Sequence, residues 1–195
     1  MQKLHSYKHL FVKAHSFVQS VVRVNHAGEL GARQIYRGQI CALKTFASKN
    51  STFEDKLDEL QHMLEGELKH LDYFTNWQPG FRPSLFNGIW QNVSFLLGFG
   101  SMALGYKTAM LLTYSVESVI ETHYTEQITQ LTPLAHTNPI LTDLLNSIKQ
   151  FLAEEIEHKH CGNLHSHTLP KLYSTTINTI FTSIVHLAIQ TSKNL

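Results

Sequence analysis

The chain has 195 residues, 43% of them hydrophobic, which suffices for one domain to bury a core without disulfide or structural-metal support. Its 16 basic and 15 acidic side chains leave a formal charge of +1, so the sequence offers no general field that would attract nucleic acid. The two cysteines, Cys41 and Cys161, lie 120 positions apart outside any C-x-x-C pattern, which indicates neither a disulfide framework nor a thiolate zinc site and fits a reducing cytoplasm.

We therefore expect one domain over residues 1–195 and no nucleic-acid partner. The first 28 residues contain four basic side chains, Lys3, Lys8, Lys13 and Arg23, but no acidic one. Such a segment is typical of a basic amphipathic targeting or membrane-contact helix, and equally of a solvated basic helix face. No apolar stretch of signal-peptide type accompanies it.

Proline and glycine are sparse along the chain, which favours long helices over strands. The first helix is expected over about residues 16–48, followed by a polar break at residues 49–52 in which Ser51 or Thr52 can cap a second helix. That second helix should reach about Trp77. Three helix-breaking residues then stop it, namely Pro79, Gly80 and Pro83.

The next stretch, Ser84–Tyr106, differs in kind, because no charged residue lies between Arg82 and Lys107. We expect it to connect two helix pairs. A third helix should continue to about Leu131 and stop at Pro133, and a fourth should begin after Asn138-Pro139 and reach the His160 region.

A further helix is expected after Pro170. Its apolar residues recur at helical spacing, which predicts a stripe packed on the bundle or, less simply, on lipid: Ile177, Ile180, Phe181, Ile184, Val185 and Ala188. Together these elements predict an all-α protein, a ferritin-like four-helix bundle with an apolar crossover segment and an extra C-terminal helix.

Two copies of an E-x-x-H pattern fall on separate expected helices, as Glu67 with His70 and Glu155 with His158. A spacing of three residues places both side chains on one helix face, where each pair can bind a metal from one side. Glu29 precedes Glu67 by 38 residues, and Glu117 precedes Glu155 by the same 38. The chain therefore contains the series E, ExxH, E, ExxH.

A shift of 88 residues maps the first half of that series onto the second, and it also maps Tyr36 onto Tyr124. Each tyrosine lies seven residues after its glutamate, almost two helical turns away on the same face. Such tyrosines can adjust the site or flank a substrate channel, although a core aromatic is the simpler interpretation.

Non-haem iron takes carboxylate and imidazole ligands, and two divalent ions would offset four buried glutamates. Helical geometry alone also admits Glu154 and Glu121, but the repeat offset favours Glu155 and Glu117. His26 shares the face of Glu29 without a histidine at its matching position. Five further side chains could extend a metal site, although solvated helix-end residues are the simpler interpretation: His123, His160, Cys161, His165 and His167.

Several segments together resemble the demethoxyubiquinone hydroxylase family over most of the chain. The most specific is the run RVNHAGELGA at residues 23–32, which continues into Ile35-Tyr36 and Gly38-Gln39. The others are Arg82-Pro-Ser, Gly98-Phe-Gly100, Val116-Glu117, His123-Tyr124, Gln127-Ile128 and Glu154-Glu155-Ile-Glu-His158. Asn25 departs from the family pattern, which usually has an acidic residue there.

The resemblance implies the same six iron ligands, Glu29, Glu67, His70, Glu117, Glu155 and His158. It also implies the reaction: an oxygen-dependent di-iron monooxygenase that hydroxylates the ring of demethoxyubiquinol during ubiquinone biosynthesis. The implied cofactors are two Fe ions and an external electron donor such as NADH. Tyr124 and His123 are the candidate catalytic residues, as outer-layer or substrate-contacting groups.

The substrate's prenyl tail would explain the apolar segment Ser84–Tyr106, which we expect to lie in a membrane interface with Trp90 at the headgroup level. Its polar residues and glycines argue against a stable span. Gly98, Gly100 and Gly105 would allow close approach of a tail or helix. A fully soluble protein with a buried bundle helix is the alternative.

The expected location is therefore peripheral, on the cytoplasmic side of a bacterial inner membrane or the matrix side of the mitochondrial one. Other ubiquinone-biosynthesis proteins and a second copy of the chain are the expected partners. Two rival functions stay open: a di-iron hydroxylase of a modified tRNA base, which the near-neutral charge disfavours, and iron storage, which would need no lipophilic segment.

Overall fold

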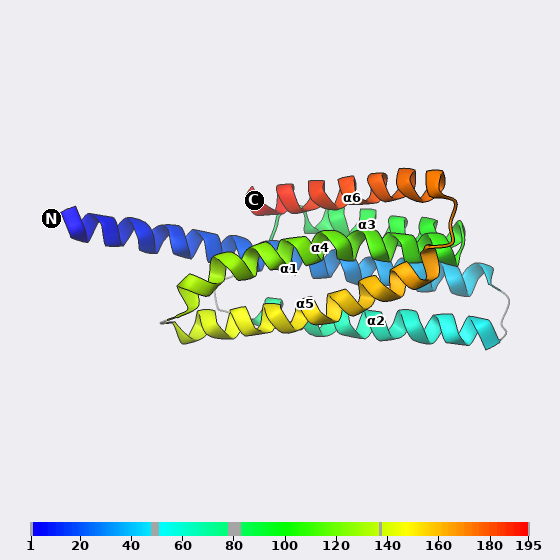
Figure 1. Ribbon diagram of the computed structural model, residues 1–195, viewed down its shortest axis with the longest axis horizontal. Coiled ribbons are helices and arrows are strands. Elements are labelled where there is room, and N and C mark those ends of the chain that lie inside the picture. Colours follow the sequence, from blue (N-terminus) through cyan, green and yellow to red (C-terminus); the bar gives the residue numbers. More distant parts are fainter. Residues whose placement is uncertain (1, 48–50, 78–82, 137, 195) are drawn as a thin grey trace.

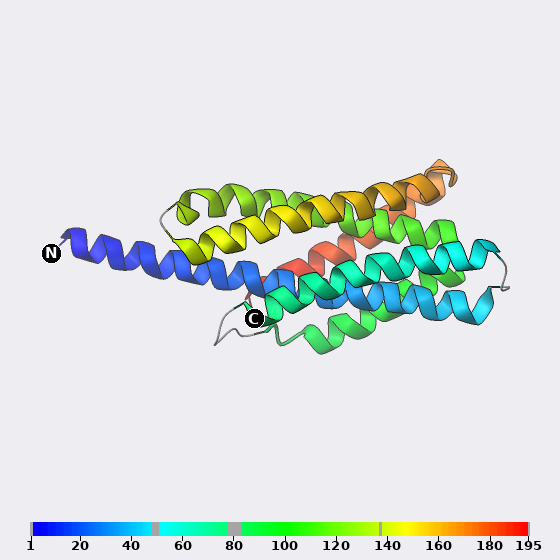
Figure 2. The same ribbon diagram turned by 90° about the horizontal axis from the view of Figure 1, so that it is seen from below.

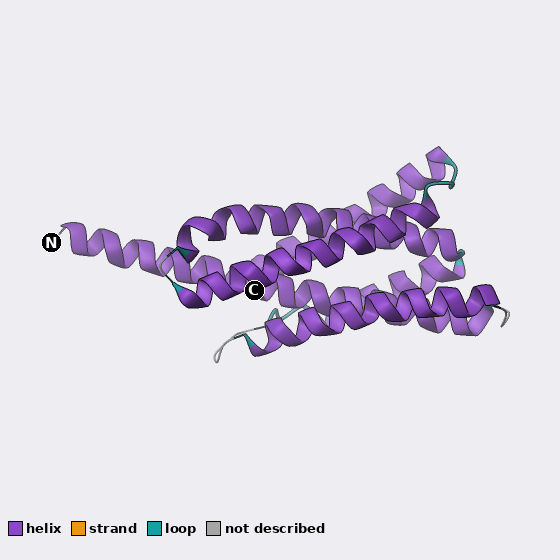
Figure 3. Cartoon of the chain, turned by 60° about the horizontal axis from the view of Figure 1, so that its bottom comes forward, coloured by secondary structure: helices purple, strands orange, loops and turns teal. Residues whose placement is uncertain are grey.

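The computed structural model describes residues 2–47, 51–77, 83–136 and 138–194. In chain order its helices are α1 (Gln2–Phe46), α2 (Ser51–Asn76), α3 (Asn87–Ala103), α4 (Tyr106–Ala135), α5 (Pro139–Ser166) and α6 (Lys171–Asn194). Figure 3 shows only helices and loops over the described residues, which confirms the all-α prediction.

Two antiparallel helix pairs form the bundle, α1 with α2 and α4 with α5 (Figures 1 and 2). Between the pairs, α3 lies along α1 and runs in the same direction. It carries the chain to the end of the bundle where α4 begins. This is the predicted ferritin-like arrangement, with α3 as the crossover and α6 as the extra C-terminal helix.

Two of the predicted helices are longer than expected, and some of the predicted breaks lie outside the described residues. The first helix begins at Gln2 rather than near Ser16, because residues 2–15 contain no proline or glycine to break it. The fourth extends to Ser166, since Gly162 does not end it but lets α5 approach α4 closely. Residues 48–50 and 78–82, with the predicted stops at Pro79 and Gly80, lie outside the described residues, as do the side chains of Lys3, Lys8 and Lys13.

The prediction that Pro133 stops the preceding helix was wrong, because α4 continues through it to Ala135. A proline inside a helix removes one hydrogen bond and crowds the carbonyl four residues earlier. Here the affected carbonyl is that of Thr129, and the loss falls in the last turn of α4, where few backbone hydrogen bonds remain. Figure 1 shows α4 bending near this end, as expected of a proline kink. The predicted start after Asn138 is confirmed, and its side chain caps Ile140 and Leu141.

The crossover helix α3 lies directly on α1 through two glycines. A Cβ atom added to Gly98 would lie 2.0 Å from the Ile35 carbonyl oxygen, and one added to Gly38 would lie 2.2 Å from that of Phe95. Gly98 therefore allows the close helix approach predicted for it. Gly100 meets nothing within 4 Å, and Gly105 instead supplies the positive φ of 119° that starts α4.

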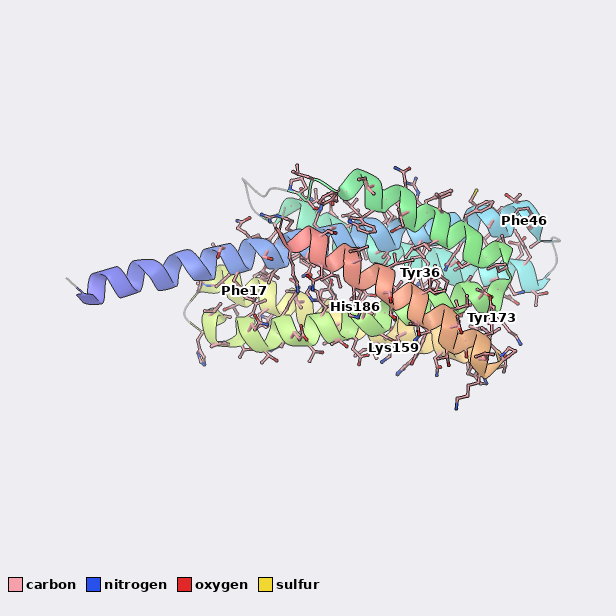
Figure 4. All side chains as sticks on the ribbon, turned by 90° about the horizontal axis from the view of Figure 1, so that it is seen from above. Phe17, Tyr36, Phe46, Lys159, Tyr173 and His186 are labelled. Atoms are coloured by element: carbon pink, nitrogen blue, oxygen red, sulfur yellow. The ribbon has the colours of Figure 1, made fainter. Side chains whose placement is uncertain are left out.

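Helix α6 covers the opening between α3 and α4, as Figure 4 shows from above. Phe181 packs with Leu112 and Val116 of α4, which confirms the predicted packing of its apolar stripe on the bundle. Ile180, another member of that stripe, is 48% exposed. By length and composition, Lys171–Lys193 is also the one candidate membrane-crossing helix among the described residues, with 6% of its apolar window buried.

Candidate metal centre

All four bundle helices contribute to a buried cluster of carboxylates and imidazoles. Helices α1 and α4 each supply one glutamate, while α2 and α5 each supply a glutamate and a histidine one turn later. The cluster contains the six predicted residues, each at most 8% exposed: Glu29, Glu67, His70, Glu117, Glu155 and His158.

The six side chains form two four-residue groups whose ligand atoms lie within 4.8 Å of one another. One contains Glu29 and His70, the other contains Glu117 and His158, and Glu67 and Glu155 belong to both. Two shared carboxylates between two sets of ligands are the arrangement that carboxylate-bridged metal pairs require. Spacing along the helices did not indicate which glutamates would be shared.

Hydrogen bonds hold the imidazoles against the shared carboxylates. His70 Nδ1 lies 3.0 Å from Glu155 Oε1, and His158 Nδ1 lies 3.2 Å from Glu155 Oε2. Across the cluster, His158 Nδ1 also lies 3.3 Å from Glu67 Oε1. Both histidines therefore present Nδ1 to the centre of the cluster.

Without a metal, the pKa values of the carboxylates in the cluster shift in opposite directions. Burial, the nearby Glu155 and other carboxylates raise the pKa of Glu67 and Glu117 well above the usual range. Burial opposes ionisation of Glu155 as well, but hydrogen bonds from His158 and His70 outweigh it and lower its pKa to about 2. Burial likewise opposes protonation of His70, yet hydrogen bonds with Glu155 and Glu29 raise its pKa to about 12.

The residues fit a pair of divalent cations. Among the described residues, no hydrogen-bond donor meets either buried carboxylate oxygen of Glu67 in bonding geometry, and a cation would satisfy both oxygens. Four carboxylates with two imidazoles form an oxygen and nitrogen donor set that suits non-haem iron. Two divalent ions would also replace the protons that Glu67 and Glu117 otherwise hold.

The competing carboxylates lie outside both groups. Glu121 forms an ion pair with Lys159 near the surface. Glu154 Oε2 contacts His70 from the outer side, 2.9 Å from Nε2, while its side chain stays 34% exposed. Glu154 therefore fixes the orientation of a candidate ligand, a role that carboxylates commonly play behind metal-bound histidines.

Both predicted tyrosines are buried core residues that also contact the cluster. The Tyr124 hydroxyl donates to Glu29 Oε1 at 2.5 Å, and the Tyr36 hydroxyl donates to Glu117 Oε1 at 3.2 Å. Each tyrosine is 1% exposed, so each is a core aromatic that also contacts a glutamate of the cluster. Each hydrogen bond therefore restricts the orientation of the carboxylate that accepts it.

His123 lies one residue before Tyr124 and belongs to a polar network beside the cluster. Its Nε2 lies 2.7 Å from Gln127 Nε2, and Gln127 exchanges two hydrogen bonds with Asn25, at 2.8 and 2.9 Å. Burial, with Lys193 and His186 nearby, lowers the pKa of His123 to about 4. Asn25, the departure from the family pattern, thus forms a neutral amide pair.

An apolar cavity reaches the cluster from the side covered by α3 and α6. Glu29, Tyr124 and His123 lie at its polar part. Its other walls come from α1, α3, α4 and α6, and include Ile35, Val93, Leu97, Ile120, Phe181 and Val185. The contribution of α6 was not predicted, because its apolar stripe fits core packing and a cavity wall equally well.

At the far end of α5 the sequence left two interpretations open for Cys161 and His165, an extension of a metal site or solvated helix-end residues. Both side chains are partly buried and contact Glu59 of α2, so they are not simply solvated. The extension of α5 to Ser166 is the reason, because it keeps these residues on the helix face that meets α2. His160 is exposed, as expected.

Comparison with known proteins adds a family to this geometry. Residues 16–192 match the family model described as "Ubiquinone biosynthesis protein COQ7". A relative from Dictyostelium discoideum named "NADPH-dependent 3-demethoxyubiquinone 3-hydroxylase, mitochondrial" is 34% identical over 158 residues, which cover 80% of this chain and 68% of the relative.

Human and bacterial relatives give a similar result. The Homo sapiens protein of the same name is 33% identical over 180 residues, covering 91% of this chain and 78% of its own. A Rhodospirillum rubrum protein named "3-demethoxyubiquinol 3-hydroxylase" is 33% identical over 153 residues, covering 75% of this chain and 64% of its own.

Proposed function

Because the chain belongs to the COQ7 family of ubiquinone biosynthesis proteins, whose relatives here are hydroxylases, we propose that it hydroxylates the ring of demethoxyubiquinol at a di-iron centre. Molecular oxygen and an external reductant would be the co-substrates. The observation that carries the proposal is the pair of ligand groups that share Glu67 and Glu155, in a cluster whose Glu29 also lines an apolar cavity.

One iron would be held by Glu29 and His70, the other by Glu117 and His158, with Glu67 and Glu155 available to both. When bound, the iron pair would supply oxygen activation, with the electrons coming from the external reductant. The protein's part is placement. Tyr124 and Tyr36 orient the two unshared glutamates from outside.

The substrate would enter through the apolar cavity, ring first. Each buried methylene of a prenyl tail contributes about 0.8 kcal/mol, which suits walls made of aliphatic side chains. Within the polar part, His123 is neutral near pH 7 because burial lowers its pKa, so its imidazole can exchange a hydrogen bond with a quinol hydroxyl. Tyr124 stands beside it, where it holds Glu29.

The cavity walls α3 and α6 lie on the same side of the bundle (Figures 1 and 4), and both helices carry exposed apolar side chains. On α3 and its flanks, Leu85, Ile89, Leu96 and Leu104 are 58 to 80% exposed. On α6, Leu172, Ile180 and Leu187 are 48 to 82% exposed. A membrane interface would cover these side chains and deliver a prenylated substrate to the cavity, so we propose peripheral attachment through this side.

The names of the relatives guide two further parts of the proposal. The Dictyostelium and human proteins are called NADPH-dependent, so a reduced nicotinamide is the class of electron donor we propose. They are also called mitochondrial, whereas the Rhodospirillum relative is bacterial. The matching locations are the matrix side of the mitochondrial inner membrane or the cytoplasmic side of a bacterial one.

The test is a reconstitution. The purified chain is loaded with ferrous iron and supplied with NADPH or a chemical reductant, a demethoxyquinol and ¹⁸O₂, and the products are weighed by mass spectrometry. We expect a quinol that has gained one labelled oxygen atom. Glu155→Ala should abolish both iron binding and product, while Glu157→Ala, an exposed neighbour on α5, should change neither. Normal turnover by a variant that binds no iron would refute the proposal.

A further inference from the structure

A second cluster of metal-binding side chains lies on α2 and α5, apart from the six residues above. It consists of Glu59, Cys161 and His165, whose ligand atoms lie within 4.8 Å of one another. Glu59 lies eight residues before Glu67, and His165 lies seven after His158. At 1.5 Å per residue these offsets are about 12 and 10 Å along antiparallel helices, so the cluster is a separate place on the α2–α5 interface.

All the contacts within this cluster converge on one carboxylate. The Cys161 thiol donates to Glu59 Oε1 at 2.8 Å, and His165 Nε2 lies 3.1 Å from the same oxygen. The Tyr106 hydroxyl donates to the other oxygen, Oε2. A thiol, an imidazole and a carboxylate are therefore already gathered around one point, with Tyr106 holding the carboxylate from behind.

Solvent reaches the cluster through an adjoining cavity. Glu59, Tyr106 and His165 line this cavity, and the side chains of His165 and Glu59 are 35% and 30% exposed. An ion can thus enter, and a water molecule can complete its coordination. Lys56 and Lys107 also line the cavity, and the Lys56 ammonium lies 5.0 Å from the centre of the Tyr106 ring.

We propose that Glu59, Cys161 and His165 bind one divalent transition-metal ion of the zinc type, with water as the fourth ligand. Thiolate, imidazole and carboxylate are the three side-chain ligands that zinc takes in proteins. A thiolate and a carboxylate together neutralise the two charges of the ion. Without metal the thiol keeps its proton, since burial and Glu59 raise its pKa to about 12, and binding would release that proton to solvent.

The separations suit such an ion. Zinc bonds of about 2.0 to 2.3 Å in a tetrahedron place the ligand atoms about 3.3 to 3.8 Å apart. The present contacts at 2.8 and 3.1 Å would have to open by less than about 1 Å, which the side-chain torsions of Glu59 and His165 can supply. The ion would then link α2 to α5 near the α2 N-terminus, away from the proposed di-iron centre.

Alkylation of the two cysteines tests the site without reference to activity. The full chain, freed of metal, is treated with iodoacetamide with and without Zn²⁺, and each cysteine is followed by mass spectrometry. We expect Zn²⁺ to slow alkylation of Cys161 at least tenfold and to leave Cys41, which is exposed, unchanged as the internal control. Equal alkylation of Cys161 with and without Zn²⁺ would overturn the proposal.

Four variants separate this site from the six-residue centre. His165→Gln and Glu59→Gln should lose the protection of Cys161, whereas His160→Gln, exposed on the same helix, should keep it. Glu155→Ala, which disables the six-residue centre, should also keep it, and loss of protection there would assign the effect to that centre instead. Circular dichroism of each variant confirms that the helices are intact.

Cobalt gives a second measurement. Co²⁺ bound to a thiolate absorbs in the near ultraviolet through sulfur-to-metal charge transfer. We expect this band in the natural chain and in Cys41→Ser, and its loss in Cys161→Ser. A band that persists in Cys161→Ser, or that never forms in the natural chain, would contradict the assignment.

Discussion

The Tyr124 hydroxyl of α4 lies 2.5 Å from Glu29 Oε1 of α1, on the opposite helix of the bundle. Tyr36 of α1 makes the equivalent contact with Glu117 of α4, at 3.2 Å. Each tyrosine stands seven residues after the glutamate of its own helix but donates to the glutamate of the other. The antiparallel course of α1 and α4 produces this exchange, since two turns forward on one helix lie opposite two turns back on its neighbour.

The first prediction concerns these hydroxyls. Tyr124→Phe should weaken binding of the iron held by Glu29 about tenfold or more, because a hydrogen bond to a charged group contributes about 1.5 to 3 kcal/mol. Tyr36→Phe should do the same for the iron held by Glu117. Anaerobic ferrous titration by calorimetry would measure both. Tyr173→Phe, which loses only a contact with Thr108, is the control, and three identical titrations would contradict the prediction.

Helical spacing foretold which residues would meet in the centre, because E-x-x-H fixes two side chains on one face whatever surrounds the helix. Spacing did not foretell that Glu67 and Glu155 belong to both groups, while Glu29 and Glu117 belong to one each. That distinction depends on how the four helices pack together. The spacing of residues within one helix carries no information about that packing.

The same limit explains the error at Pro133 and the position of Cys161. Proline predicts a helix end on average, yet in the last turn of α4 only a few hydrogen bonds are left to lose. Helix α5 continues past Gly162 to Ser166 and packs closely on α4 there, since a Cβ atom at Gly162 would lie 2.7 Å from the Tyr114 backbone nitrogen. Cys161 therefore lies on the helix and contacts Glu59.

The second prediction concerns the metal-free protein and pH. The pKa values of Glu67 and Glu117 are raised on folding by burial and neighbouring carboxylates, and those of His70 and His158 are raised by their carboxylate partners despite burial. Folding then takes up protons at pH values between the unfolded and the folded pKa of each group, so stability falls there as pH rises, by up to about 1.4 kcal/mol per unit and group. Both histidines begin to act in this direction above about pH 6.5, and His70 continues to do so toward its folded pKa of about 12.

Metal should reverse the trend, because divalent ions replace the protons and bind more tightly as competing protons are removed. The thermal midpoint of chelator-treated protein should therefore fall across this range while the gap to the metal-loaded protein widens. Differential scanning calorimetry at several pH values measures both. A metal-free midpoint that rises with pH would contradict the assigned shifts. Glu155 does not enter, since its lowered pKa matters only below about pH 4.5.

The third prediction compares two glycines of α3. Gly98→Ala should destabilise the chain by at least about 1 to 3 kcal/mol, because the new Cβ would overlap the Ile35 carbonyl and push α3 off α1. Gly100→Ala meets nothing within 4 Å and should stabilise the helix by up to about 1 kcal/mol. Urea unfolding of the two variants measures the difference. Equal effects of the two substitutions would mean that α3 is not held against α1 at Gly98.

The last prediction concerns attachment to membranes. The natural chain should co-sediment with phospholipid vesicles, and Ile89→Glu combined with Leu96→Glu should reduce the partition coefficient onto the vesicles by at least a hundredfold. These two side chains are 58% and 67% exposed on α3, and burying each contributes about 1.5 to 3 kcal/mol. Leu164→Glu is the matched control, since that leucine is 66% exposed on α5 and should not face the membrane.

The outcome also separates the proposed enzyme from an iron-storage protein of the same fold. A hydroxylase of a prenylated quinol has to bind a substrate whose tail lies in the membrane. Iron storage requires no membrane contact and does not explain exposed leucines on the helices that line the cavity. If Leu164→Glu lowers binding as much as the α3 substitutions do, attachment is unspecific. If the natural chain does not sediment with vesicles, the tail must reach the cavity from water, and the exposed side chains of α3 and α6 require another partner.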